Sequence, residues 1–242
     1  DNIVYKTFVN KFNEQYSGKL TEQQQALLSY YISENTPLYG NGTGISITRD
    51  KEICSGDSCN SLNIKFPNHV GTHIDLPSHF DPDGKSLSDF EPGFWEFNNV
   101  EIIDLNGKIG ECELIDQWHL NDFTNTKTDF LLIKTGFGDF RGTDKYTLTA
   151  PGISSKLANY FRLKFPHLKC IGMDLISATS YSNREEGRKA HNAFLNPSNG
   201  DPILFIEDMK LDGIKKLNKI IVAPLLIKDA DGVPCTIYGY SN

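Results

Sequence analysis

The sequence has little positive charge. It contains 24 lysines and arginines against 31 aspartates and glutamates, which gives a formal net charge of −7 at pH 7. No block of basic residues is present that would neutralise phosphates, so we expect neither a nucleic acid nor an anionic membrane as partner. No apolar run reaches the roughly 20 residues of a membrane-spanning helix, and the first residues lack the apolar core of a signal peptide. We therefore expect a cytoplasmic protein that acts on a small molecule.

Cysteine is also sparse, with five residues scattered at Cys54, Cys59, Cys112, Cys170 and Cys235. Cys54 and Cys59 are near enough to close a small loop, but nothing beside them would complete a four-ligand zinc site. We favour free thiols in a reducing compartment over a disulfide framework.

Short apolar runs alternate with a few helical patterns, which predicts an α/β domain with a mixed sheet. The expected strands are 45–49, 61–66, 100–105, 130–135, 170–177, 203–209, 220–227 and 233–240. The expected helices are 150–165 and 184–195. Strands 45–49 and 61–66 precede the segment that carries most of the chemistry, and we expect them to hold it.

The N-terminal residues have a different pattern. Val4, Phe8, Phe12 and Tyr16 recur at four-residue spacing, which predicts an amphipathic helix. Thr21 and Gln24 resemble a capping box for a second short helix through Leu27, although the following residues 27–33 read equally well as a strand. We expect residues 1–27 to be a helical extension, packed on the domain or on a partner subunit, and residues 28–242 to be one catalytic domain.

The twelve residues HVGTHIDLPSHF, from His69 to Phe80, hold three of the six histidines in the chain and one aspartate. His69, His73, Asp75 and His79 all occupy odd positions, so an extended chain would direct their side chains to one face. At about 3.3 Å per residue, His73 and Asp75 lie about 7 Å apart, whereas His69 and His73 would lie about 13 Å apart in a straight strand. We therefore expect bends at Gly71, where glycine relieves backbone clashes, and at Pro77.

These donors are nitrogen and oxygen atoms without sulfur. Such a set suits zinc, manganese or iron(II) with an open coordination position better than a closed structural zinc site. The ordinary alternative is that the histidines are loop or core residues bonded to backbone. Their density in one short stretch makes the metal site the better hypothesis.

The segment resembles the HxGTHxDxPxHF signature of the metal-dependent cyclase and kynurenine formamidase family, with every fixed position present. The similarity extends over residues 28–240 and includes LLIKTGFG, APGIS and IGMDLIS. It implies a swivelling β/β/α domain, with a mixed sheet or partly closed barrel and flanking helices, in a homo-oligomer such as a dimer or tetramer.

The resemblance also implies roles for single residues. His69, His73 and Asp75 would bind the metal, and His79 would transfer protons, or bind a second metal where one is present. His191 and Glu207 fall where the family places a later histidine and glutamate, and would complete the metal site or orient the attacking water. The cofactor would be divalent zinc or manganese, with one or two ions per chain.

The implied activity is hydrolysis of an amide, lactam or related bond of a small, aromatic substrate, of the arylformamidase or isatin hydrolase type. A divalent ion lowers the pKa of water from about 15.7 toward 7 and polarises a carbonyl, and a histidine then moves the proton. A cyclase, a lactone hydrolase and an inactive ligand-binding protein remain alternatives. A serine nucleophile is less favoured because no GxSxG elbow is present. Tyr39, Phe94 and Trp95 are candidate substrate contacts.

Overall fold

The computed structural model describes residues 24–241, which form thirteen strands and a small number of helices. The strands are β1 Gln24–Leu27, β2 Ser46–Lys51, β3 Ser61–Lys65, β4 His73–Asp75, β5 Glu96–Phe97, β6 Val100–Asp104, β7 Leu114–Ile115, β8 Phe130–Lys134, β9 Gly152–Ile153, β10 Cys170–Met173, β11 Leu204–Glu207, β12 Lys219–Pro224 and β13 Gly232–Ser241. The α-helices are α2 Asp144–Leu148, α3 Leu157–Lys164 and α4 Arg184–Leu195, and short 3-10 turns occupy several loops. No helix in this range has the length and apolarity needed to cross a bilayer.

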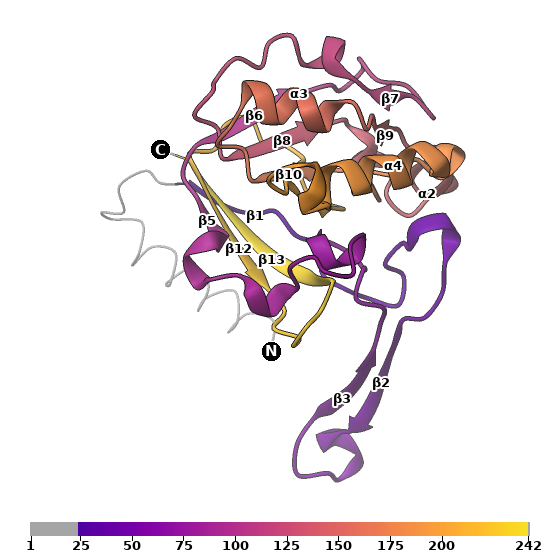
Figure 1. The fold of residues 1–242 in the computed structure, drawn as a ribbon. Helices are drawn as coiled ribbons and strands as arrows, with labels where there is room; N and C mark the ends of the chain where they lie inside the picture. The colour runs from indigo at the N-terminus through magenta and orange to yellow at the C-terminus, as the bar shows by residue number, and fades with distance from the viewer. Residues whose placement is uncertain (1–23, 242) are drawn as a thin grey trace.

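The main sheet is mixed, as predicted. Its nine strands include the path β5-β12-β13-β4-β11-β10-β8-β6, with β1 paired to β13. Strands β6, β8, β10 and β11 run parallel, whereas β4 is antiparallel to both of its neighbours, β11 and β13. The sheet curves into a nearly closed barrel (Figure 1). The short strand β4 therefore lies where the parallel part of the sheet meets the antiparallel part.

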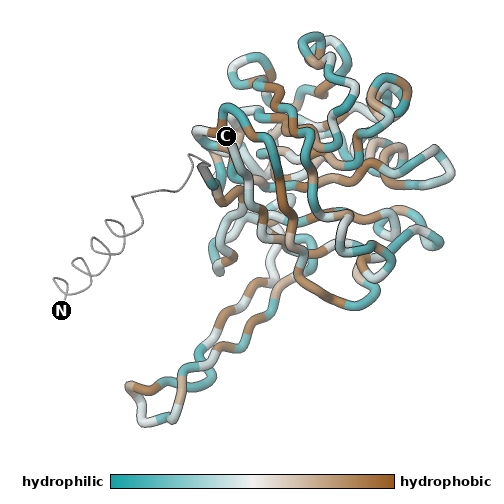
Figure 2. The backbone as a smooth tube through the Cα atoms, turned by 90° about the vertical axis from the view of Figure 1, so that its left-hand side faces the viewer, coloured by the Kyte–Doolittle hydropathy of each residue, from teal (hydrophilic) through white to brown (hydrophobic). Residues whose placement is uncertain are grey.

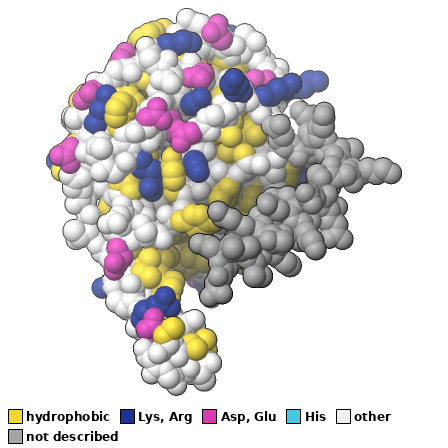
Figure 3. Space-filling model, turned by 180° about the vertical axis from the view of Figure 1, so that it is seen from behind, with side chains coloured by type: hydrophobic (Ala, Val, Ile, Leu, Met, Phe, Trp, Pro, Cys, Tyr) yellow, Lys and Arg dark blue, Asp and Glu magenta, His cyan; other side chains and the backbone are white. Residues whose placement is uncertain are grey.

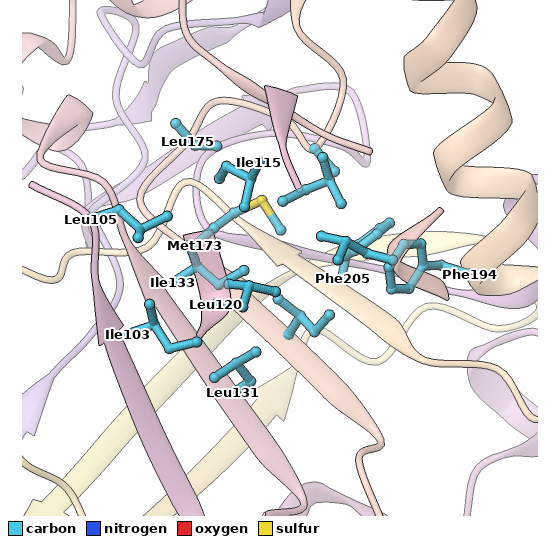
Figure 4. Packing of buried hydrophobic residues seen from close by; sticks show 14 of the residues in the cluster. Ile103, Leu105, Ile115, Leu120, Leu131, Ile133, Met173, Leu175, Phe194 and Phe205 are labelled. Atoms are coloured by element: carbon cyan, nitrogen blue, oxygen red, sulfur yellow. The ribbon is translucent and has the colours of Figure 1, made fainter. Parts of the chain in front are cut away.

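Helices α3 and α4 cover one face of the parallel strands (Figure 1). The strand β8 is buried at all but its last position, so this run is apolar without alternation, as is usual for a strand covered on both faces. Figure 4 shows side chains from β6, β8, β10 and β11 in one apolar cluster, with Phe205 of β11 beside Phe194 of α4. A second apolar cluster lies around β4, β12 and β13 and includes Ile74.

The hairpin formed by β2 and β3 projects from the body of the molecule (Figure 1). The two predicted strands are confirmed, but they form a separate two-stranded sheet. They extend away from the main sheet, so the expectation that they hold the segment from His69 to Phe80 is wrong. Hydrophobic residues lie along the hairpin (Figure 2), and Leu62 and Ile64 are half exposed. Figure 3 shows hydrophobic side chains where the hairpin joins the body and at its tip.

The prediction of a short helix through Leu27 is wrong for residues 24–27, the part of it that the structure describes. Residues Gln24–Leu27 form β1, which pairs antiparallel with β13 from Gln24 opposite Ser241 to Leu27 opposite Tyr238. Sheet pairing over the full length of the segment outweighs the weak local helical signal. The predicted helix over the residues before Gln24 lies outside the described part of the chain.

A buried ion pair fixes the end of β11. The Arg141 guanidinium donates to both carboxylate oxygens of Asp208, at 2.7–3.1 Å, and the Tyr146 hydroxyl donates to the same carboxylate. Asp208 has a positive φ of 51° and is fully buried. Its backbone carbonyl accepts a hydrogen bond of 2.6 Å from Thr72. The pair thus links the loop after β8 to the residue that follows Glu207.

Arg141→Met should lower the free energy of unfolding by about 3–5 kcal/mol, because it leaves the buried Asp208 carboxylate without its cation. Chemical denaturation followed by circular dichroism measures the change. Lys189→Ala is the control, because its ion pair with Glu185 is exposed and screened by solvent, and it should leave the stability almost unchanged. Equal effects of the two substitutions would contradict the role assigned to the buried pair.

Candidate metal centre

The centre of the site is built on two neighbouring strands. His73 and Asp75 lie on β4, and Glu207 of β11 pairs directly with His73 in the antiparallel register. Because side chains opposite each other in a ladder share a face, these three groups meet on one side of the sheet. The His73 Nε2 atom lies 3.5 Å from Asp75 Oδ1 and 3.4 Å from Glu207 Oε2. Ile74, between them, points to the apolar cluster on the other face.

The predicted bend at Gly71 is confirmed, since its φ is +58°. It brings the His69 ring within 5.3 Å of the His73 ring, measured between centroids. His69 Nδ1 lies 2.8 Å from Asp75 Oδ1. A Cβ atom at Gly232, which pairs with Asp75, would lie 2.3 Å from the His69 ring, so only glycine leaves room for this imidazole. The left-handed backbone at Gly71 and the absence of a side chain at Gly232 together allow the His69 ring to lie beside Asp75.

Helix α4 brings His191 to the same carboxylates. His191 Nε2 lies 3.2 Å from Asp75 Oδ2 and 3.3 Å from Glu207 Oε1. Its Nδ1 atom lies 2.9 Å from the carbonyl oxygen of Gly187, one turn earlier in the helix. The ring of Phe80 stacks on His191 at 4.9 Å between centroids, which limits rotation of the imidazole.

The orientation of two imidazoles fits a metal site. His73 Nδ1 contacts the Gly71 carbonyl at 2.8 Å, in the same way that His191 Nδ1 contacts Gly187. An N–H donated to the backbone fixes the tautomer and leaves each Nε2 free for a cation, as in known metal-binding histidines. The Ser177 hydroxyl and the Ala178 amide donate to Glu207 Oε1 at 3.0 and 2.7 Å, which orients that carboxylate.

Asp231 is a site residue that sequence reasoning missed. One of its oxygens, Oδ2, lies 2.8 Å from His79 Nδ1 and 3.2 Å from His69 Nε2. Asp231 is 152 residues beyond His79, in the loop before β13. The turn sequence DADG at 229–232 gave no sign of a role, because only the pairing of β13 with β4 brings it to the motif.

Mutual electrostatics set the charge states in the site. Burial opposes the charged imidazole of His73, but hydrogen bonding and attraction by Glu207 and Asp75 raise its pKa to about 9. Burial likewise opposes the charge of His191, but Asp75 and Glu207 raise its pKa to about 10. The pKa of each buried carboxyl is lowered despite desolvation, because the imidazoles hold the anionic form. In the metal-free protein at neutral pH, protons on the histidines therefore balance the carboxylates.

The donors form three overlapping groups in which one ligand atom per residue lies within 4.8 Å of the others. The groups are His69, His73 and Asp75; Asp75, His191 and Glu207; and His69, His79 and Asp231. All supply nitrogen or oxygen atoms, which suits a divalent ion such as zinc or manganese. The residues present therefore fit a metal, and Asp75 is shared by the first two groups.

A cavity of about 320 Å³ opens over these groups. The six predicted metal-site residues all border it, namely His69, His73, Asp75, His79, His191 and Glu207. The remaining lining residues are Tyr39, Phe80, Ser177, Thr179, Arg184 and Arg188.

Of the three predicted substrate contacts, one borders the cavity and two do not. Tyr39, in the 3-10 turn Tyr39–Asn41, borders the cavity. Phe94 and Trp95 do not border it, because they pack with Phe90 and Phe97 against the apolar cluster of the antiparallel strands. The rings of Phe94 and Trp95 therefore contribute to the packing of the apolar core. Arg184 and Arg188 were missed, although their helical spacing to His191 would have placed all three on one face.

Known proteins resemble this chain in sequence and in fold. The family model described as "Cyclase: Putative cyclase" matches residues 27–179. A kynurenine formamidase from Geobacillus thermodenitrificans is 30% identical over 212 residues, covering 86% of this chain and 92% of the relative. Cyclase-like protein 2 from Oryza sativa is 25% identical over 221 residues, covering 86% of this chain and 75% of the relative. Isatin hydrolase A from Labrenzia aggregata has a similar fold, with a TM-score of 0.77 at 17% identity over 95% of this chain and 98% of that one.

Binding of zinc or manganese to the metal-free protein at pH 7 should release about two or more protons per ion, because His73 and His191, whose pKa values are raised, must lose their protons to act as ligands. Calorimetric titration in buffers of different ionisation enthalpy measures this number. The affinity should rise with pH up to about 10, where both His73 and His191 have lost their protons without the ion.

The His167→Gln variant is the control for this titration, since His167 is exposed and does not border the cavity, and it should release the same number of protons. Metal binding without net proton release would contradict the assigned charge states.

Proposed function

Because this chain belongs to the putative cyclase family, we propose that it is a metal-dependent hydrolase that cleaves an amide, lactam or related carbon–nitrogen bond of a small aromatic substrate. The observation that carries the proposal is the convergence of His69, His73, Asp75, His191 and Glu207 on one cavity. The names of the similar proteins, kynurenine formamidase and isatin hydrolase, support an aromatic amide or lactam as substrate.

The metal would be held by His69, His73 and Asp75, with His191 and Glu207 completing the site around the shared carboxylate of Asp75. We propose zinc or manganese, with one or two ions per chain. A bound divalent ion supplies positive charge that acidifies water and polarises the substrate carbonyl. The apolar face of Phe80 and the stacked His191 border the remaining space.

We assign proton transfer to His79. Asp231 lies 2.8 Å from Nδ1 of His79 and, by accepting its N–H, leaves Nε2 as the nitrogen that exchanges a proton. His79 is partly exposed, with 31% of its side chain accessible, so it can reach the substrate. It takes a proton from the attacking water and returns it to the leaving nitrogen, as a histidine near neutral pH is suited to do.

The decisive experiment is hydrolysis of N-formylkynurenine and of isatin before and after chelation, with the metal content measured on the same samples. We expect activity that chelation abolishes and that added zinc or manganese restores. His79→Ala should retain at least one ion and lose roughly a hundredfold or more in kcat, the usual scale of general acid–base catalysis.

His73→Ala is the matched comparison, because it removes a proposed ligand and should lose both metal and activity. Unchanged turnover in His79→Ala would contradict the proton-transfer role. Protein that binds no divalent metal under any condition would overturn the proposed function.

We further propose that residues 28–242 form one catalytic domain that assembles as a dimer or tetramer in the cytoplasm. Free thiols at all five cysteines support a reducing compartment. The projecting hairpin and the exposed side chains of Leu62, Ile64 and Leu226 support an interface between subunits.

The paired substitution Leu62→Asp and Ile64→Asp should convert the assembly to monomers in light scattering coupled to gel filtration, because it would bury two charges in the interface. Ile53→Asp is the control, because Ile53 is an exposed residue of the same hairpin that lies in the turn between β2 and β3. It should leave the assembly intact if the interface is formed by the strands. A wild-type protein that is already monomeric at micromolar concentration would contradict the proposal.

A further inference from the structure

Two arginines of α4 border the cavity above the metal-binding residues. Arg184, Arg188 and His191 are spaced by four and three residues, so they lie on one face of the helix. All three line the cavity, and both arginines are exposed at its opening. The helix therefore presents an imidazole at the bottom of the cavity and two guanidinium groups toward its mouth.

Neither arginine forms an ion pair with an acidic residue within the described part of the chain, although the charge of Arg188 contributes to lowering the pKa of Glu185. The Arg184 guanidinium lies over the ring of Tyr181 at 5.1 Å. The acidic residues of the same helix are engaged elsewhere: Glu185 pairs with Lys189 at 2.8 Å, and Glu186 accepts from the amide and hydroxyl of Ser155. In a chain with an excess of acidic residues, two unpaired arginines beside a cavity indicate a ligand of negative charge.

Tyr39 adds a third donor. Its hydroxyl oxygen is buried and has no hydrogen-bond partner among the described residues, although the ring borders the cavity. The ring packs edge-on against Tyr181 at 5.3 Å between centroids, which places it beside the residue that Arg184 covers. Burial raises the pKa of Tyr39 to about 12, so the phenol stays protonated at neutral pH and donates. A buried hydroxyl without a partner is costly, and a bound acceptor would relieve that cost.

We propose that the substrate carries a carboxylate remote from the scissile bond, held by Arg184 and Arg188 with the Tyr39 hydroxyl as a further donor. This inference rests on the proposed function and names the substrate class of the same site. The three groups offer donors only, and guanidinium forks match the two oxygens of a carboxylate.

The placement of charge makes this end of the cavity suited to an anion. The charges of Asp75 and Glu207 at the bottom are balanced by the imidazoles beside them, whereas the arginines at the mouth form no ion pair and attract a carboxylate there. A substrate anchored there by its carboxylate directs its other end to the metal-binding residues. The arginines would therefore select the substrate and fix its orientation without taking part in bond cleavage.

The test compares N-formylkynurenine with its methyl ester, which lacks the negative charge of the carboxylate. We expect the wild-type enzyme to prefer the acid by about tenfold or more in kcat/KM, the scale of a charge-assisted hydrogen bond. The preference should fall as salt is raised from 0.01 to 0.5 M, because the arginines are exposed and their attraction is screened over about 10 Å at 0.1 M salt.

Arg184→Gln and Arg188→Gln should each raise KM for the acid with little change in kcat, and leave the ester unaffected. Lys189→Gln is the matched control, since this neighbouring lysine is paired with Glu185 and does not line the cavity. It should retain the full preference for the acid. Equal loss of activity on acid and ester in the arginine variants, or an equal effect of Lys189→Gln, would overturn the proposal.

Binding of benzoate and of its neutral counterpart benzamide to the metal-loaded protein gives a readout that does not depend on turnover. Wild-type protein should bind benzoate more tightly, and both arginine variants should lose that difference. If neither formyl substrate is hydrolysed but the arginine-dependent benzoate affinity is present, the reaction fails and the anion subsite stands. If both substrates are hydrolysed without regard to charge, the function stands and the subsite is refuted.

Discussion

Burial of two carboxylates side by side is the constraint on which the site depends. Asp75 and Glu207 project from adjacent strands and are almost inaccessible to solvent. Each would repel the other in a medium of low dielectric, so the pair is tolerated only with compensating positive charge. The imidazoles of His73 and His191 lie between them and carry that charge as protons when no ion is bound. A divalent cation satisfies the same requirement, which explains why one set of residues fits both states.

The architecture holds these groups with little freedom to move. The strand β4 has only three residues, but it is hydrogen-bonded to a neighbour on each side, and its central residue Ile74 is packed in the opposite core. The residue after Glu207 is held by the bidentate contact from Arg141. Such a frame preorganises polar groups, because their positions follow from the sheet and not from mobile loops.

Positive charge in the cavity is arranged at two depths. Imidazoles at the bottom face buried carboxylates, and their charge depends on pH and on metal. The guanidinium groups of Arg184 and Arg188 at the mouth are charged under all ordinary conditions. One helix contributes to both levels, since His191 follows the two arginines on the same face. Helix α4 thus contributes both to the bottom of the cavity, where the candidate metal ligands lie, and to its mouth, where the arginines would bind a negatively charged group.

The sequence by itself determined the segment from His69 to Phe80 that gathers the candidate ligands, the bend at Gly71 and most strands of the mixed sheet, because these depend on local spacing and apolar runs. His191 and Glu207 were placed by family resemblance, and the structure brings both to the segment from His69 to His79. Tertiary structure alone decided the role of Asp231, the space at Gly232 for the His69 ring, the assignment of Phe94 and Trp95 to the core, and the strand at Gln24–Leu27. In each of these cases the partner lies on a distant strand or turn, and the contact exists only after strand pairing has fixed which residues oppose one another.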